Sequence, residues 1–187
     1  EIMSRTLACS FLATRRQFIV RPLFGAALSA FFIDVASTSA QEADAFLKKE
    51  TVLLLPPGKD NPRNSEGDFI RLKTGEILFV YTRYYASSAN DDAPARLVSR
   101  IADSEGRNWS SDDALILENE GRLNVMSVTL LRFPDDSIAL FYLVKDAPGD
   151  CRPYLRFSRD EGKTWSERTS ITDVPTYNVL NNSRVVI

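Results

Sequence analysis

The feature that most constrains this chain is an internal repeat. The segment Phe69–Tyr81 aligns with the segment Leu130–Tyr142 at an offset of 61 positions. Farther along, Ala102–Trp109 aligns with Ser158–Trp165 at an offset of 56 positions. A repeat of about fifty residues that holds several short strands is typical of a β-propeller blade. The sequence therefore predicts an all-β fold built from consecutive four-stranded sheets.

Short apolar runs of strand length recur after residue 50, and turns rich in Gly, Asp, Asn and Pro separate them. The expected strands are Thr51–Leu55, Phe69–Leu72, Ile77–Tyr81, Arg96–Ile101, Leu115–Leu117, Val125–Phe133, Ile138–Val144 and Tyr154–Phe157. The two offsets differ by five, so the first repeat holds five extra residues between Tyr81 and Ala102. Because loops on a repeated scaffold often carry function, this polar stretch is a candidate site.

Composition excludes several classes of site. The chain has 187 residues and no histidine, which rules out a Ser-His-Asp triad and imidazole metal ligands within it. Its two cysteines, Cys9 and Cys151, support neither a disulfide framework nor a thiolate zinc site. The formal net charge of −2 offers no basic surface for nucleic acid. No metal and no cofactor are expected.

Residues 1–40 have the composition of an export signal. Basic residues precede the uncharged run Leu23–Ile33, and small residues follow it up to Ala40. The run is too short to span a bilayer as a helix. The segment Thr14–Ile19 resembles the twin-arginine signal, which implies the twin-arginine export machinery as a partner and a bacterial periplasmic or extracellular location. The alternative is a buried N-terminal helix.

A turn motif lies inside the repeat. The pattern Ser158-x-Asp160-x-Gly162-x-Thr164-Trp165 resembles the Asp box, the bacterial neuraminidase repeat, and Ala102–Trp109 is a degraded copy. Asp and Ser side chains bond backbone amides in tight turns, glycine permits positive φ, and tryptophan can pack between sheets. In that family the boxes lie away from the substrate pocket. Asp160 is therefore interpreted as a turn residue.

Residues 50–187 resemble the sialidase superfamily, and bacterial exo-sialidase-like proteins in particular. The resemblance implies a six-bladed propeller, of which residues 41–187 supply two to three blades after the signal peptide. It also implies three arginines that hold a sugar carboxylate, an aspartate general acid, and a tyrosine nucleophile assisted by a glutamate. The third arginine, the tyrosine and the glutamate are expected in later blades, outside this chain.

The resemblance carries over onto four residues. Arg63 precedes the first inner strand and Arg83 follows the next strand, as the first two arginines of the family do. Asp91 and Asp92 follow within a short loop, where the family has its acid, and Asp92 is favoured. Guanidinium groups bind carboxylates through paired hydrogen bonds, and an enclosed carboxylic acid can protonate a leaving oxygen. The family's Phe/Tyr-Arg-Ile-Pro pattern is absent around Arg63.

Two further residues are candidates for the same substrate-binding surface. Asn124 is equivalent to Arg63 under the offset of 61, and Arg152 lies in the segment Cys151-Arg152-Pro153-Tyr154. Each candidate also has a structural interpretation as a solvated or ion-paired loop residue. Arg71 and Arg132, in contrast, recur at equal repeat positions, which indicates a role in the scaffold.

These observations predict an exported glycoside hydrolase that removes a terminal sialic acid, or another acidic sugar, from glycans. The alternatives are a non-catalytic propeller that binds glycan or protein through the same surface, and an Asp-box scaffold with no connection to sugars. The chain starts before Met3 and stops inside an apolar run. We therefore expect part of a longer protein, inactive and poorly soluble by itself; the alternative is a natural end in a final strand.

Overall fold

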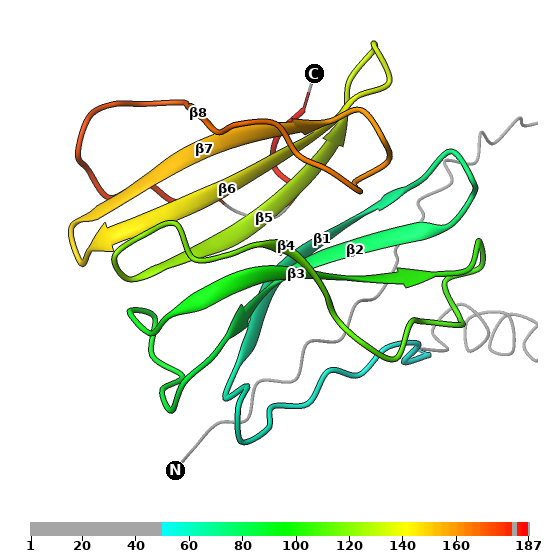
Figure 1. The fold of residues 1–187 in the computed structure, drawn as a ribbon, viewed down its shortest axis with the longest axis horizontal. Coiled ribbons are helices and arrows are strands. Elements are labelled where there is room, and N and C mark those ends of the chain that lie inside the picture. Colours follow the sequence, from blue (N-terminus) through cyan, green and yellow to red (C-terminus); the bar gives the residue numbers. More distant parts are fainter. Residues whose placement is uncertain (1–49, 181–182, 187) are drawn as a thin grey trace, which may run out of the picture. The chain divides into compact units, whose positions relative to one another are not determined.

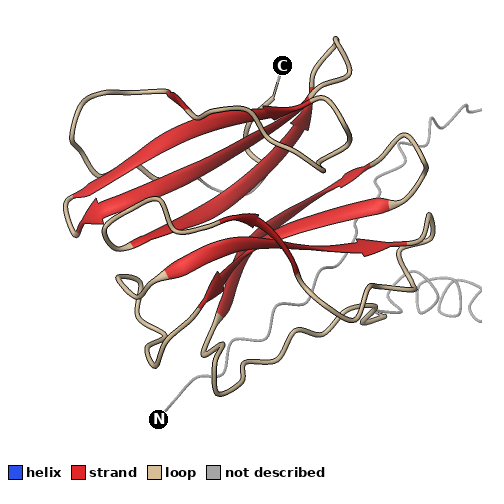
Figure 2. Cartoon of the chain, in the orientation of Figure 1, coloured by secondary structure: helices blue, strands red, loops and turns tan. Residues whose placement is uncertain are grey.

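The computed structural model describes residues 50–180 and 183–186. These residues form two four-stranded antiparallel sheets, each with its strands in sequential order (Figures 1 and 2). Blade 1 consists of β1 Asn64–Arg71, β2 Ile77–Tyr84, β3 Ala95–Ala102 and β4 Ala114–Leu117. Blade 2 consists of β5 Asn124–Arg132, β6 Ile138–Ala147, β7 Asp150–Ser158 and β8 Thr169–Ser170. The predicted all-β architecture is confirmed, and its two sheets are consistent with two propeller blades.

Seven of the eight predicted strands correspond to β1 to β7, and the two-residue strand β8 was missed. The segment Thr51–Leu55 is the exception, since it pairs with none of the strands in the described part of the chain. Its side chains Leu53 and Leu55 instead pack against one face of blade 1. The predicted signal peptide lies outside the described residues. No helix among the described residues is long and apolar enough to cross a membrane.

The first strands of both blades carry a bulge at the same repeat position. In β1 the register against β2 shifts between Ser65 and Gly67, and Glu66 has a φ of 32°. In β5 the register against β6 shifts between Met126 and Thr129, and Ser127 has a φ of 60°. Glu66 and Ser127 are 61 positions apart, so the repeat extends to backbone conformation. Positive φ is unfavourable for residues with a Cβ, and it is held here by the surrounding sheet.

The main core lies between the two blades. Successive residues of a strand face opposite sides of the sheet. The strand β2 therefore contributes Leu78 and Val80 to this core, while Phe79 and Tyr81 lie on the opposite face of blade 1. The buried side chains of blade 2 in this core include Val128, Ile138, Leu140 and Tyr142. A buried polar contact joins the blades as well: the carboxylate of Asp68 in β1 accepts a hydrogen bond of 2.9 Å from the Leu130 amide in β5.

The two Asp-box hairpins have equivalent settings. Trp165 packs on the core between the blades, and Trp109 packs edge-on against Phe79 on the corresponding face of blade 1. The Asp160 carboxylate accepts hydrogen bonds from the backbone amide and the hydroxyl of Thr164, at 2.9 and 2.6 Å. These bonds lower the pKa of Asp160 to about 2. Asp160 is therefore a charged turn residue with no proton to donate at neutral pH.

The degraded box keeps its turn by a different carboxylate. Asp103 accepts hydrogen bonds from the Arg107 amide at 2.9 Å and from the Glu105 amide at 3.2 Å. Under the offset of 56, Asp103 is equivalent to Arg159, one position before Asp160. The carboxylate that binds the turn amides thus lies one repeat position earlier in the degraded box than in the complete one.

Glu161 links the Asp box of blade 2 to both blades. Its carboxylate accepts two hydrogen bonds from the Arg132 guanidinium, at 2.9 and 2.8 Å, and one from the Lys73 amide of blade 1 at 2.8 Å. Arg132 also donates to the Arg71 carbonyl at 3.1 Å. The hydrogen bonds from Arg132, followed by the one from Lys73, lower the pKa of Glu161, against the opposing effect of burial. Arg132 therefore has the scaffold role that its repeat position indicated.

We expect Glu161→Gln to reduce the free energy of unfolding by about 1 kcal/mol at pH 7. The pKa of Glu161 is lower in the folded protein than in the unfolded chain. The ionised carboxylate therefore contributes to the free energy of unfolding above the unfolded pKa, and this contribution is lost as the pH falls through the folded pKa. Urea unfolding at pH 7 and at about pH 3 measures this difference. Glu105→Gln is the control, because Glu105 is exposed and lies 3.9 Å from its partner Arg107. An equal loss in both variants would contradict the assignment.

Candidate functional site

The predicted site residues and the Asp boxes lie at opposite ends of the strands. Since β1 and β5 run antiparallel to their neighbours, their first residues lie at the same end as the β2–β3 and β6–β7 connections. The Asp boxes lie at the other end, in the β3–β4 and β7–β8 connections (Figure 1). The β2–β3 connection is a long loop that spans residues 85–94, whereas the equivalent β6–β7 connection consists only of residues 148–149. The extra residues predicted from the repeat offsets are in this loop.

Arg63 and Asp91 form an ion pair at this end. The two groups are 2.5 Å apart, from Nη1 to Oδ1. Arg63 also donates to the Ala89 carbonyl and to the Ser65 hydroxyl, both at 3.2 Å, and its guanidinium lies over the Tyr84 ring, 4.6 Å from the centroid. The side chain of Asp91 is 72% exposed, against 29% for Arg63. The guanidinium is thus held firmly, and its counter-ion is accessible from solvent.

Asp92 has a different partner, Lys145 at the end of β6. The ammonium lies 2.6 Å from the Asp92 carboxylate, and the Lys145 side chain is only 5% exposed. The ring of Tyr177 lies 5.5 Å from the same ammonium. The sequence analysis missed Lys145. The available signal was a lysine inside an otherwise apolar strand, where a buried charge is rare unless it is paired.

Asn124 anchors the β2–β3 loop. The residue is fully buried, and its amide nitrogen donates to the carbonyls of Asp91 at 2.7 Å and of Ala93 at 2.9 Å. It is the equivalent of Arg63 in blade 2, as predicted, but it contacts the backbone of the loop that carries the two aspartates. The structure therefore brings Arg63, Asp91, Asp92 and Asn124 together with Lys145.

Arg83 and Arg152 have other partners. Arg83 projects from the opposite face of β2 to Tyr84 and pairs with Asp113 at 3.3 Å. Asp113 is further bound by Tyr81 and Arg100, and this cluster lines a polar pocket of about 250 Å³. Arg152 pairs within its own hairpin, with Asp150 at 2.9 Å and Asp146 at 3.4 Å. The structure does not join either arginine to the group around Arg63.

Three of the buried side-chain polar atoms that lack a hydrogen-bond partner among the described residues lie in this region. They are the Glu66 Oε2 atom, the Tyr84 hydroxyl and the Asn124 Oδ1 atom. A buried polar atom that lacks a partner costs free energy, so most native structures hold few of them, and each calls for a ligand, a water molecule or a functional explanation. The three atoms near Arg63 are therefore candidates for contact with a polar ligand.

The cysteine of this region is unsuited to thiolate chemistry. Burial, the largest cause, raises the pKa of Cys151 to about 11, so its thiol stays protonated at neutral pH. Burial likewise raises the pKa of Tyr84. Among the described residues, no group of three or more Cys, Asp or Glu side chains is arranged to hold a metal ion. The groups that remain are two cations paired with loop carboxylates and a set of hydrogen-bonding atoms, which suit an anionic, hydroxyl-rich ligand.

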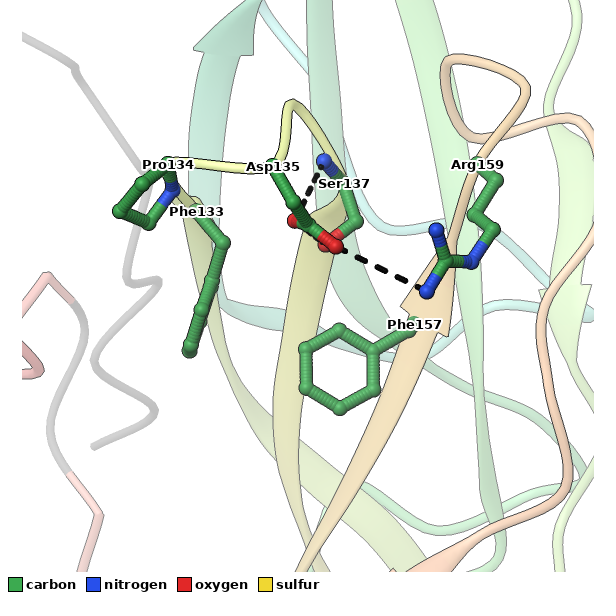
Figure 3. Close-up of a pocket in the computed structure, with 6 residues that line it drawn as sticks. All are labelled: Phe133, Pro134, Asp135, Ser137, Phe157 and Arg159. Atoms are coloured by element: carbon green, nitrogen blue, oxygen red, sulfur yellow. Dashed lines mark hydrogen bonds and ion pairs between the residues drawn. The ribbon is translucent and has the colours of Figure 1, made fainter.

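A second pocket, of about 320 Å³, lies at the Asp-box end of blade 2 (Figure 3). The rings of Phe133 and Phe157 meet edge to face with centroids 5.4 Å apart, and Asp135 lies 3.6 Å from Arg159. The remaining lining residues are Pro134 and Ser137. None of the predicted site residues lines this pocket, so it is separate from the group around Arg63.

Comparisons with known proteins show the fold and leave the activity open. No family model and no curated protein matches the sequence. A protein of unknown function from Dyadobacter fermentans aligns with a TM-score of 0.53 and 20% identity over 60% of this chain and 37% of its own. The Hadza microbial sialidase Hz136 aligns with a TM-score of 0.48 and 14% identity over 60% of this chain and 26% of its own. A glycosyl hydrolase from Bacteroides ovatus aligns with a TM-score of 0.47 and 15% identity over 59% of this chain and 31% of its own. The chain thus spans about a third of these proteins.

Proposed function

We propose that this chain is part of an exported sialidase-like glycoside hydrolase that cleaves a terminal sialic acid, or another acidic sugar, from glycans. The observation that carries the proposal is the Arg63–Asp91 pair. A guanidinium fixed at the start of the first strand of a blade holds an exposed carboxylate, and a sugar carboxylate can take the same place. The Asp boxes and the two-blade architecture support the same family. The activity would belong to the whole protein.

The contacts favour Asp91 over Asp92 as the general acid, although the sequence favoured Asp92. A sugar carboxylate bound to Arg63 would remove the cation from Asp91 and place a second negative charge beside it. Both changes favour protonation of Asp91, which would then be able to protonate the glycosidic oxygen. Asp92 keeps its buried partner Lys145 throughout, and this pair fixes the loop in position.

A hydrolysis assay of the whole protein on sialosides tests the proposal. We expect Asp91→Asn to lower kcat/KM by about a hundredfold or more on a sialoside with a sugar leaving group, and by much less on a fluorogenic sialoside, whose leaving group needs little protonation. Asp92→Asn should lower both rates by a similar, smaller factor, because it only loosens the loop. Arg63→Ala should raise KM on both substrates. Sugar binding without any hydrolysis would favour the non-catalytic propeller instead.

A further inference from the structure

We propose that Glu66 is a further ligand-binding residue of this site and that its carboxylate accepts hydrogen bonds from hydroxyl groups of the bound sugar. The proposal deepens the proposed function and rests on it for the identity of the ligand. It is based on three features of the described residues: the backbone at Glu66, the state of its carboxylate, and the groups around it.

The backbone presents Glu66 through the bulge in β1. The bulge leaves Glu66 outside the register between Ser65 and Gly67, at a φ of 32°. The Glu66 carbonyl accepts a hydrogen bond from the Thr82 hydroxyl at 3.3 Å. At Gly67 an added Cβ would lie 2.7 Å from the Phe79 ring and 2.8 Å from the Tyr81 Cβ, so only glycine fits there. Bulges of this kind are frequent beside binding sites because they redirect one side chain.

The bulge is a feature of the repeated scaffold, whereas the glutamate side chain at this position occurs in blade 1 and is not repeated in blade 2. Blade 2 has the same bulge at the equivalent position, and there the residue is Ser127. A serine therefore satisfies the fold at this position. The glutamate of blade 1 places a half-buried carboxyl group there that the scaffold does not require.

The carboxylate of Glu66 is incompletely satisfied. Its Oε2 atom is buried and has no hydrogen-bond partner among the described residues. An ionised carboxylate offers several acceptor positions and donates nothing, so it needs N–H or O–H donors. Leaving such an atom buried without a donor is costly, and a ligand that supplies hydroxyl groups removes this cost.

The surrounding groups specify the class of ligand. Burial, and after it the charges of Glu66 and Asp91, raises the pKa of Tyr84, with the Arg63 charge opposing. Glu66 directly follows Ser65, whose hydroxyl accepts a hydrogen bond of 3.2 Å from the Arg63 guanidinium that lies over the Tyr84 ring. The Asn124 Oδ1 atom is a second buried acceptor without a partner. One cation flanked by acceptors matches a sugar that carries both a carboxylate and several hydroxyl groups.

The test is a binding titration of the whole protein, of which this chain is a part, with two probes, N-acetylneuraminic acid and propionate. Propionate carries the carboxylate without the hydroxyl groups. We expect Glu66→Gln to weaken binding of the sugar by about tenfold and to leave propionate binding unchanged. Glu66→Ala should weaken sugar binding at least as much. Glu105→Gln removes the same charge at the Asp-box end and should change neither affinity. Thermal unfolding of each variant shows whether it is folded.

The outcomes separate the two proposals. If Arg63→Ala weakens binding of both probes while the Glu66 variants bind the sugar like the wild type, the role of Glu66 is refuted and the proposed function stands. If Glu66→Gln weakens the binding of both probes equally, Glu66 acts only through Arg63. That result also refutes the proposed role of Glu66 as a ligand-binding residue. If Arg63→Ala leaves sugar binding unchanged, the proposed function itself is refuted.

Discussion

Replacement of Gly162 by alanine is expected to destabilise the protein by about 2–4 kcal/mol, which lowers the unfolding temperature by roughly 10 °C. Gly162 has a φ of +85°, a conformation that costs any residue with a Cβ. The added Cβ would also lie 2.7 Å from Leu78 Cδ2 in the core between the blades. Leu78 is 3% exposed, so its side chain has little room to move away. Strain and overpacking therefore act together.

Two other glycines provide a graded control for this prediction. Gly106, the equivalent in the degraded Asp box, has a φ of +72°, and its added Cβ would lie 3.2 Å from Ile77 Cδ1. Gly149 has nothing within 4 Å of an added Cβ. Calorimetric scans should therefore show the largest loss for Gly162→Ala, a smaller loss for Gly106→Ala and little change for Gly149→Ala. Equal losses at Gly162 and Gly149 would contradict both the backbone strain at Gly162 and the close contact of its hairpin with Leu78 of blade 1.

Loss of the Asp68 carboxylate is expected to loosen the contact between the blades. Asp68 is 5% exposed and accepts hydrogen bonds from the Leu130 amide of blade 2, from the Phe69 amide and from the Ser183 hydroxyl, at 2.9, 2.9 and 2.6 Å. Asp68→Ala leaves the buried Leu130 N–H without a partner, so we expect a loss of about 2–4 kcal/mol in the free energy of unfolding. Asp68→Asn should cost less, because one carboxamide oxygen still accepts.

Amide hydrogen exchange distinguishes this effect from a general loss of stability. In Asp68→Ala the Leu130 amide should exchange much faster, while amides paired inside blade 2, such as those between β6 and β7, should change only by the global loss. Glu76→Gln, at an exposed position in the β1–β2 hairpin, serves as the control. Uniform acceleration across both blades would contradict a local role for Asp68 at the interface.

The fold was largely predictable from the sequence, because a repeat fixes many contacts at once. The equivalence of Trp109 and Trp165 placed both hairpins in the same setting, which the structure confirms. The offsets also located the extra residues in the β2–β3 loop. The segment Thr51–Leu55 was wrongly predicted as a sheet strand, since an apolar run shows burial but does not show whether a backbone partner is available.

The site was predictable only in part. The family resemblance placed Arg63, Asp91 and the favoured Asp92 at one site, the repeat position added Asn124, and the structure brings these residues close together. Lys145 and Glu66 were not identified, because their importance depends on a buried ion pair and on a bulge. Arg83 shows the reverse case. Its spacing suited the site, but the alternation of β2 directs it to Asp113 on the other face.

The sequence by itself determined the repeat, the strands β1 to β7 and the two Asp-box turns. Such features depend on residues close together in the chain, and local periodicity and turn chemistry specify them. Only the tertiary structure decided which charges meet, namely Arg63 with Asp91, Lys145 with Asp92 and Arg83 with Asp113. The physical reason is that an ion pair acts over a few ångströms of space, whereas its partners are 28, 53 and 30 positions apart in the chain.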